Sequence, residues 1–277
     1  MILTVLAAFV MSTATVEEPV CAPPSGVEQL WGSENTRFIF IGERHGTVEA
    51  PGAFGEIVCE AARTQPITVA LELPSFLQAD LDTYLASDGG GEARAALLAN
   101  NFWTRVKDGR GSIAMISMIE RVRALKAAGQ DVAFAAFQPS RPNRPNGFGQ
   151  GYYEIEMAEA LSRAAQDRPD SLVLVLVGAL HAAKSRLSSL DNSLAAAGHL
   201  PPSEVMSVNV ALQGGEAWDC TQAPDGGLEP VCGPNSEITR IDSSKRGVSI
   251  ELGGDSAFDG MLALGRSTAS PPAVTDD

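Results

Sequence analysis

The sequence predicts a single three-layer α/β/α domain with a mostly parallel central sheet, spanning residues 21–265. Short and nearly continuous apolar segments recur along the chain, which is typical of parallel strands covered by helices on both faces. Stretches with helical spacing of apolar residues separate these segments, and no linker divides the chain. The 277 residues, 44% of them hydrophobic, are enough for one such core.

Five apolar segments are expected to form the main strands, and two later ones to form edge strands. The five are 37–42, 67–73, 131–137, 172–178 and 205–210, and the edge strands are 248–252 and 261–264. Helices are expected over 112–129, capped by Ser112, and over 153–166. A third is expected over 182–198, with Leu187, Leu190 and Leu194 facing inward and Gly198 ending it. Residues 266–277 are polar and contain proline, which predicts a flexible tail.

The charge balance narrows the range of partners. Twenty Lys and Arg residues against 34 Asp and Glu residues give a net charge of −14. A chain this acidic repels phosphate backbones and anionic lipid surfaces. We therefore expect a small-molecule or peptide substrate, no nucleic acid, and no stable membrane insertion once a leader segment has been removed.

The first residues resemble a leader segment. Residues 2–10 form an apolar run of nine, far short of the ~20 residues that span a bilayer. The run fits the apolar part of a secretory signal peptide over residues 1–20, with Ser12 and Ala14 before the cut. No basic residue precedes it, since the first is Arg37, and the alternative is a buried N-terminal strand. The signal peptide predicts a periplasmic or secreted protein.

Four cysteines agree with export. Cys220 and Cys232 bracket a turn-rich loop that a disulfide would close, and Cys21 would then pair with Cys59. Four cysteines allow three connectivities, and this one follows from proximity alone. The alternative is four reduced, buried thiols in a cytosolic protein.

Polar residues follow the predicted strands at the points where they end. Glu43 and His45 follow the first strand, Glu72 ends the second, Gln138 follows the third and His181 follows the fourth. Parallel strands bring these ends to one edge, where ligands bind in such sheets. Both histidines stand in a Gly-x-x-His motif at an expected helix start, which predicts neutral imidazoles.

These motifs resemble a known superfamily. Ile-Gly-Glu-Arg-His-Gly, Leu-Glu-Leu-Pro and Gly-Ala-Leu-His, in this order, are similar to erythromycin esterase-like, ChaN-like haem-binding and TIKI/TraB-type proteins. The resemblance implies a parallel α/β core and site residues at Glu43, His45, Glu72 and His181. Residues 257–262 are similar to the closing strand of that superfamily. Its members include esterases, metal-dependent proteases and a haem-binding lipoprotein, so the function stays open.

The residue types favour hydrolysis. A neutral His45 oriented by Glu43 or Glu72 could activate water, while His181 could stabilise an oxyanion or protonate the leaving group. His45, His181 and Glu72 could instead hold a divalent metal such as Zn²⁺ or Mn²⁺. The sequence has no Gly-x-Ser-x-Gly motif and no cysteine near a strand end, which disfavours covalent catalysis.

Other residues are candidates for substrate binding. Arg44 and Gln138 accompany the strand ends, and Arg141 and Arg144 lie in residues 139–151, a possible lid for an anionic group. A solvated, proline-rich loop is the equal alternative for this segment. Trp103 could line the pocket or belong to the core.

A binding module is the second functional hypothesis. Haem needs an axial ligand, and His45, His181, Tyr84, Tyr152 and Tyr153 could provide one, although no C-x-x-C-H motif occurs. A haem site leaves the two strand-end glutamates unexplained. A third hypothesis is a non-catalytic secreted interaction domain.

Overall fold

A computed structural model describes residues 19–140, 149–190, 192–223, 229–251 and 257–275 of the protein. Its central sheet contains β1 (Phe38–Glu43), β2 (Ile67–Pro74), β3 (Val132–Gln138), β4 (Leu172–Gly178), β7 (Val205–Val210), β10 (Gly247–Ile250) and β11 (Gly260–Ala263). The strand order is β10-β11-β7-β1-β4-β2-β3, and β10 alone of these strands is antiparallel to its neighbour. The predicted mostly parallel α/β fold is confirmed.

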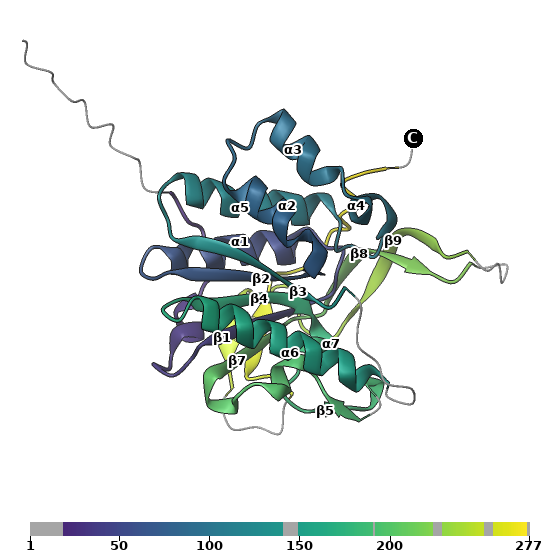
Figure 1. Cartoon of the computed structure of the whole chain (residues 1–277). Coiled ribbons are helices and arrows are strands. Elements are labelled where there is room, and N and C mark those ends of the chain that lie inside the picture. The colour runs from purple at the N-terminus through teal and green to yellow at the C-terminus, as the bar shows by residue number, and fades with distance from the viewer. Residues whose placement is uncertain (1–18, 141–148, 191, 224–228, 252–256, 276–277) are drawn as a thin grey trace, which may run out of the picture.

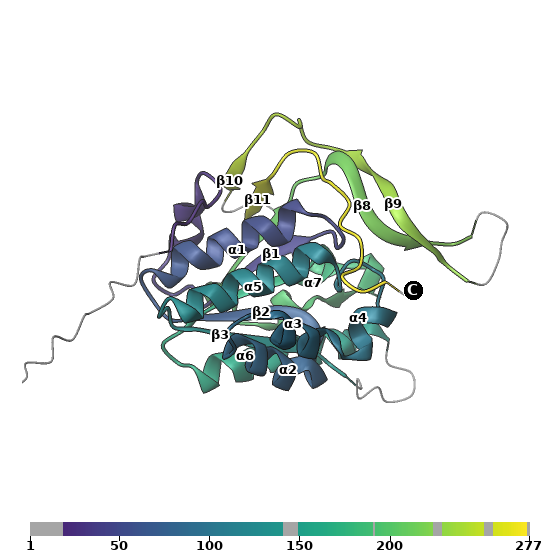
Figure 2. The ribbon, with the colours of Figure 1, turned by 90° about the horizontal axis from the view of Figure 1, so that it is seen from above.

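Helices cover both faces of this sheet (Figures 1 and 2). Helices α1 (Glu49–Ala62) and α5 (Ile113–Ala127) lie on one face and α6 (Gln150–Asp167) on the other. Side chains of β1 alternate between the two cores, with Ile39 and Ile41 on the α1/α5 side and Phe40 on the α6 side. Between β2 and α5 the chain forms α2 (Gln78–Leu85), α3 (Gly91–Leu98) and α4 (Asn101–Arg105).

Ser112 caps α5 as the sequence predicts, since its Oγ accepts a hydrogen bond from the Met115 N–H at 3.3 Å. The helix expected over 182–198 is wrong. The chain forms the single turn α7 (Ala179–Ala182), the short hairpin strands β5 (Arg186–Leu187) and β6 (Ser193–Leu194), and 3₁₀ turns. The Lys184 N–H donates to the Ala257 carbonyl instead of continuing the helix, and the Lys184 ammonium pairs with Asp259 at 2.6 Å. These contacts override the helical spacing of the leucines.

A two-stranded antiparallel hairpin, β8 (Gln213–Thr221) and β9 (Val231–Thr239), projects beyond the central sheet (Figure 1). Cys220 and Cys232 face each other across this hairpin and form a disulfide. The second disulfide joins Cys21 to Cys59. The predicted pairing is therefore confirmed, and two disulfides point to an oxidising environment.

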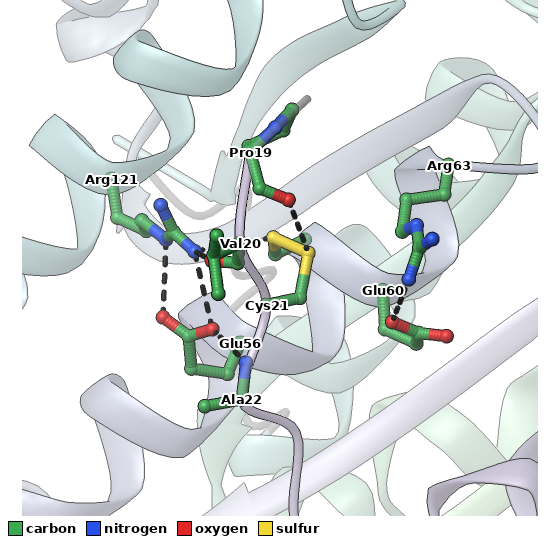
Figure 3. Close-up of a disulfide and its surroundings, with 9 residues drawn as sticks. Pro19, Val20, Cys21, Ala22, Glu56, Glu60, Arg63 and Arg121 are labelled. Atoms are coloured by element: carbon green, nitrogen blue, oxygen red, sulfur yellow. Dashed lines mark hydrogen bonds and ion pairs between the residues drawn. A yellow bond between two sulfur atoms is a disulfide. The ribbon is translucent and has the colours of Figure 1, made fainter. Parts of the chain in front are cut away.

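The Cys21–Cys59 disulfide fixes the first described residues to α1 (Figure 3). Glu56 accepts a hydrogen bond from the Ala22 N–H at 2.7 Å and pairs with Arg121 of α5 at 3.1 Å. Arg121 also donates to the Val20 carbonyl. The predicted signal peptide falls almost entirely on residues 1–18, outside the described residues. No helix in the described ranges has the length and apolar character needed to cross a bilayer.

Residues 266–275 do not form the flexible tail that the sequence predicts. They run back along the carboxyl edge of the sheet, between the hairpin and α5 (Figure 2). The Ser270 N–H donates to the Gly46 carbonyl, and the Ala273 N–H donates to the Gly111 carbonyl. These hydrogen bonds satisfy backbone polar groups of the segment, as pairing in an edge strand would. A polar segment is therefore fixed along this edge of the sheet. We call residues 267–274 the C-terminal strap.

Candidate active site

The carboxyl ends of β1, β4 and β2, three adjacent strands, bring the predicted site residues together. Glu43, His45, Glu72 and His181 line one pocket of about 660 Å³. Arg44 and Gln138, predicted substrate-binding residues, line it as well. The pocket also includes Tyr153, which the sequence analysis considered only as a haem ligand, and residues that it did not select: Asp108, Arg110, Gln150 and Asp219.

His45 lies between two buried glutamates. Its Nδ1 is 3.0 Å from Glu43 Oε1 and its Nε2 is 3.3 Å from Glu72 Oε2. Glu72 Oε2 also accepts the Gly178 N–H at 2.8 Å. Both ring nitrogens of His45 therefore face a carboxylate, and the imidazole is fixed in the plane that these two partners define.

His181 has a glutamate partner that the sequence analysis missed. Its Nδ1 is 2.8 Å from Oε2 of Glu154, which is completely buried on α6. Glu154 in turn accepts the Ala196 N–H at 3.0 Å and a hydrogen bond from Gln150 at 3.1 Å. The signal was present in the sequence, because Glu154 occupies the same helical face as the buried apolar residues Met157, Ala158, Leu161 and Ala165.

Glu72 connects the two imidazoles. Its Oε1 is 3.8 Å from His181 Nε2, while its Oε2 faces His45. The five side chains therefore form one line of alternating carboxylates and imidazoles, in the order Glu43, His45, Glu72, His181, Glu154. We call this line the carboxylate–imidazole chain.

The glutamates control the protonation of the histidines. Burial lowers the pKa of His45, but the charge of Glu72 and the hydrogen bond to Glu43 outweigh it and raise that pKa to about 10. Burial of Glu72 is likewise outweighed by His45, which leaves the pKa of Glu72 at about 2. For His181, the hydrogen bond to Glu154 overcomes burial and raises the pKa. The prediction of a neutral imidazole is therefore wrong for His45, because the nearby carboxylates act more strongly than a helix N-terminus.

The pKa of Glu43 differs in direction from that of Glu72. Burial raises its pKa, although the contact with His45 opposes this rise. Its Oε2 is buried and has no hydrogen-bond partner within the described part of the chain. Of the two glutamates that face His45, Glu43 is thus the one that holds a proton more readily.

A fixed guanidinium lies beside the chain. Arg110 donates to both oxygens of Asp108, with the shortest distance at 2.6 Å, and to Gln138 Oε1 at 2.7 Å. Its Nη1 is 3.6 Å from Glu72 Oε1. Burial raises the pKa of the neighbouring Tyr153 to about 12, with a further contribution from the charge of Glu72, so its phenol keeps its proton.

Glycine in the Gly-x-x-His motif permits this crowding. A Cβ on Gly178 would lie 3.2 Å from His45 Nε2 and 3.4 Å from Glu72 Oε2. A Cβ on Gly42 would lie 3.0 Å from Ala182 Cβ, so this glycine allows α7 to approach β1. Gly178 thus makes room for His45 of the first Gly-x-x-His motif, and Gly42 makes room for α7, which carries His181 of the second.

The remaining substrate-binding predictions have different outcomes. Arg44 lies at the pocket rim, where it pairs with Asp219 and Glu237 of the hairpin, each at 3.0 Å. Trp103 is fully buried in the α1/α5 core and does not reach the pocket, so its assignment to substrate binding is wrong. Arg141 and Arg144 lie outside the described residues.

The predicted metal ligands converge but do not form a metal centre. In the described ranges, no group of three or more His, Cys, Asp or Glu side chains is arranged to hold a metal ion. Glu72, the shared ligand of that prediction, already accepts the Gly178 N–H and lies beside the Arg110 guanidinium. The positive charge of Arg110 already balances the negative charge of Glu72, which a divalent metal would need. These residues therefore do not fit such an ion.

The residues considered for haem are dispersed. Tyr84 is buried on α2 and donates to Glu120 at 2.6 Å, and Tyr152 lines a separate pocket with Ile155. Tyr153 stands in the main pocket with the two histidines. That pocket contains buried carboxylates, whereas haem needs an apolar slot.

Comparison with known proteins establishes the class of fold. The structure resembles a protein from Bacillus cereus, with a TM-score of 0.63 and 11% identity, covering 90% of this chain and 94% of that one. It resembles a succinoglycan biosynthesis protein, with a TM-score of 0.60 and 12% identity, covering 86% and 90%. No protein-family model and no curated protein matches the sequence.

A third solved structure bears on the superfamily that the motifs suggest. It is a mutant of the erythromycin esterase EreC in its open conformation, with a TM-score of 0.58 and 9% identity, covering 86% of this chain and 88% of that one. The resemblance predicted from the motifs is thus confirmed at the level of the fold, which this chain shares with an erythromycin esterase.

Proposed function

We propose that the protein is a hydrolase that cleaves an ester or a related acyl bond with water, using His45 and His181 as its acid–base pair. The observation that carries this proposal is the carboxylate–imidazole chain at the carboxyl edge of the sheet. Two imidazoles, each with Nδ1 held by a glutamate, face one pocket through Nε2. Hydrolysis needs one group to accept a proton from water and another to protonate the leaving group.

The surroundings of the pair support the same chemistry. Arg110 is fixed by Asp108 and Gln138, so its charge is in place before a substrate binds. Tyr153 provides a neutral hydroxyl in the same pocket. A pocket of about 660 Å³ lies within the usual range for small-molecule sites and also admits a short peptide.

The fold and the disulfides support the substrate class and the location. An erythromycin esterase has the same fold, which makes an ester the first substrate class to test. Two disulfides are typical of oxidising compartments and rare in the reducing cytosol. We therefore place the enzyme in the periplasm or outside the cell.

A panel of carboxylic esters and short peptides tests this proposal. We expect hydrolysis by the wild type, and for esters of unactivated alcohols a decrease in kcat/KM of about 10²- to 10⁴-fold in both His45→Gln and His181→Gln. The control is His199→Gln, since His199 lies outside this pocket. A Soret band in purified protein, or activity that is unaffected by both substitutions, would contradict the proposal.

A further inference from the structure

The two imidazoles of the site are not equivalent, and the difference lies at Nε2. His45 Nε2 is 3.3 Å from Glu72 Oε2, and its Nδ1 is 3.0 Å from Glu43. His181 Nε2 is 3.8 Å from the nearer Glu72 oxygen, which is beyond hydrogen-bonding distance. One imidazole therefore has acceptors at both nitrogens, whereas the other leaves one nitrogen open toward the pocket.

The partners at Nδ1 differ as well. Glu154 contacts His181 Nδ1 with both oxygens, at 2.8 and 2.9 Å, and is held by the Ala196 N–H. In the neutral ring this arrangement fixes one tautomer, with the proton on Nδ1 and a lone pair on Nε2. His45 lies between Glu43 and Glu72, and two carboxylates favour the doubly protonated ring.

We infer that His181, oriented by Glu154, is the base that activates water, and that His45 is the acid that protonates the leaving group. This assignment rests on the proposed hydrolase function and reverses the roles that the sequence alone suggests. The higher protonation of His45, whose pKa is raised to about 10, agrees with the role of a proton donor. Glu154 is a positioning residue, because it reaches the substrate only through His181.

The proton balance of the reaction is complete with these groups. Water attacks the ester carbonyl carbon and transfers one proton to His181 Nε2, which forms a tetrahedral intermediate. The bond between this carbon and the alcohol oxygen then breaks, and His45 Nε2 donates a proton to the departing oxygen. Glu72 lies between the two Nε2 atoms, 3.3 Å from that of His45 and 3.8 Å from that of His181, on the path that returns one proton from His181 to His45.

Two esters of one acid separate the roles. A 4-nitrophenyl ester releases a stable anion that needs no proton, whereas the ethyl ester releases an alkoxide that does. We expect His45→Gln to lower kcat/KM for the ethyl ester by about 10²- to 10⁴-fold and for the 4-nitrophenyl ester by less than about tenfold. His181→Gln should lower both by a similar large factor, because water must be activated in each case.

Hydroxylamine provides a second measurement. It attacks 4-nitrophenyl esters without a base, so it should restore turnover of that ester by His181→Gln and by Glu154→Gln. A purely structural role of Glu154 predicts no rescue, and the thermal midpoint of each variant shows whether it folds. His199→Gln serves as the matched control.

Three results have distinct meanings. The opposite pattern, with His45→Gln inactive on both esters and His181→Gln impaired only on the ethyl ester, overturns the assignment but leaves the hydrolase function intact. Equal losses in both variants on both esters also overturn it. A wild type that cleaves neither ester contradicts the proposed ester hydrolysis, and the assignment is lost with it.

Discussion

Glu154 Oε2 lies 2.8 Å from His181 Nδ1, although 27 residues separate the two along the chain. The glutamate is completely buried on a helix, and the histidine follows a strand. The contact therefore links the α6 layer directly to the edge of the sheet.

The first prediction concerns the stability that this contact provides. Glu154→Ala should lower the free energy of unfolding by about 3 kcal/mol, because it leaves the half-buried His181 imidazole and the Ala196 N–H without their partner. Urea unfolding measures this change. The control is Glu159→Ala on the same helix, an exposed residue 3.8 Å from Arg163, which should change stability by less than about 0.5 kcal/mol. Equal effects would contradict the prediction.

The second prediction concerns pH. The pKa of His45 rises from an ordinary 6.5 to about 10 in the folded protein, so protonation stabilises the folded state. This contribution is fully present below pH 6.5 and is lost as the pH rises through about 10. The stability advantage of the wild type over His45→Gln should therefore shrink between pH 7 and pH 10 in urea unfolding. A constant difference over this window would refute the prediction.

The third prediction concerns the disulfides. The oxidised protein should show no free thiol when titrated under denaturing conditions. Replacing Cys21 and Cys59 by serine should cost about 4 kcal/mol, and replacing Cys220 and Cys232 about 3 kcal/mol, since the loops they close span 38 and 12 residues. Urea unfolding of the two double variants tests the ranking, and the reverse order would show that loop length does not govern it.

The fourth prediction concerns the C-terminal strap. Ser270 is buried, its N–H donates to Gly46 and its Oγ accepts the Ala114 N–H at 3.0 Å. Ser270→Ala leaves that N–H unpaired and should cost about 1 to 3 kcal/mol. Removing residues 266–277 should abolish activity, because Gly46 adjoins His45. Ser203→Ala, at an exposed site, is the control, and full activity of the truncated protein would contradict this role.

The sequence predicts the sheet well because its signals are local. Each main strand is an apolar run bounded by polar or turn residues, and β4 is buried along nearly its whole length. The leucines at 187, 190 and 194 show the limit of such patterns, since their spacing is helical while Leu187 and Leu194 lie in the short strands β5 and β6. Lys184 contacts Ala257 and Asp259, more than seventy positions away, and these contacts direct the chain after Lys184 away from a helix.

The site is predictable in part for a similar reason. Glu43, His45, Glu72 and His181 follow strands whose direction fixes their meeting point. Glu154 reaches the same point from a helix on another layer, and only its place within an apolar helical face distinguishes it. The protonation of the histidines depends on these distant carboxylates, so local position relative to a helix end does not reveal it.

The C-terminal strap has a consequence for biosynthesis. The Thr268 N–H donates to Glu49 across 219 residues, and the Ser270 N–H holds the carbonyl next to His45. A nascent chain that has emerged from the ribosome only as far as Gly265 already contains all five members of the carboxylate–imidazole chain. It lacks the strap backbone that, together with the Trp218 N–H, holds the Gly46 carbonyl next to His45. The loop that carries His45 is therefore fully anchored only after the strap has been made.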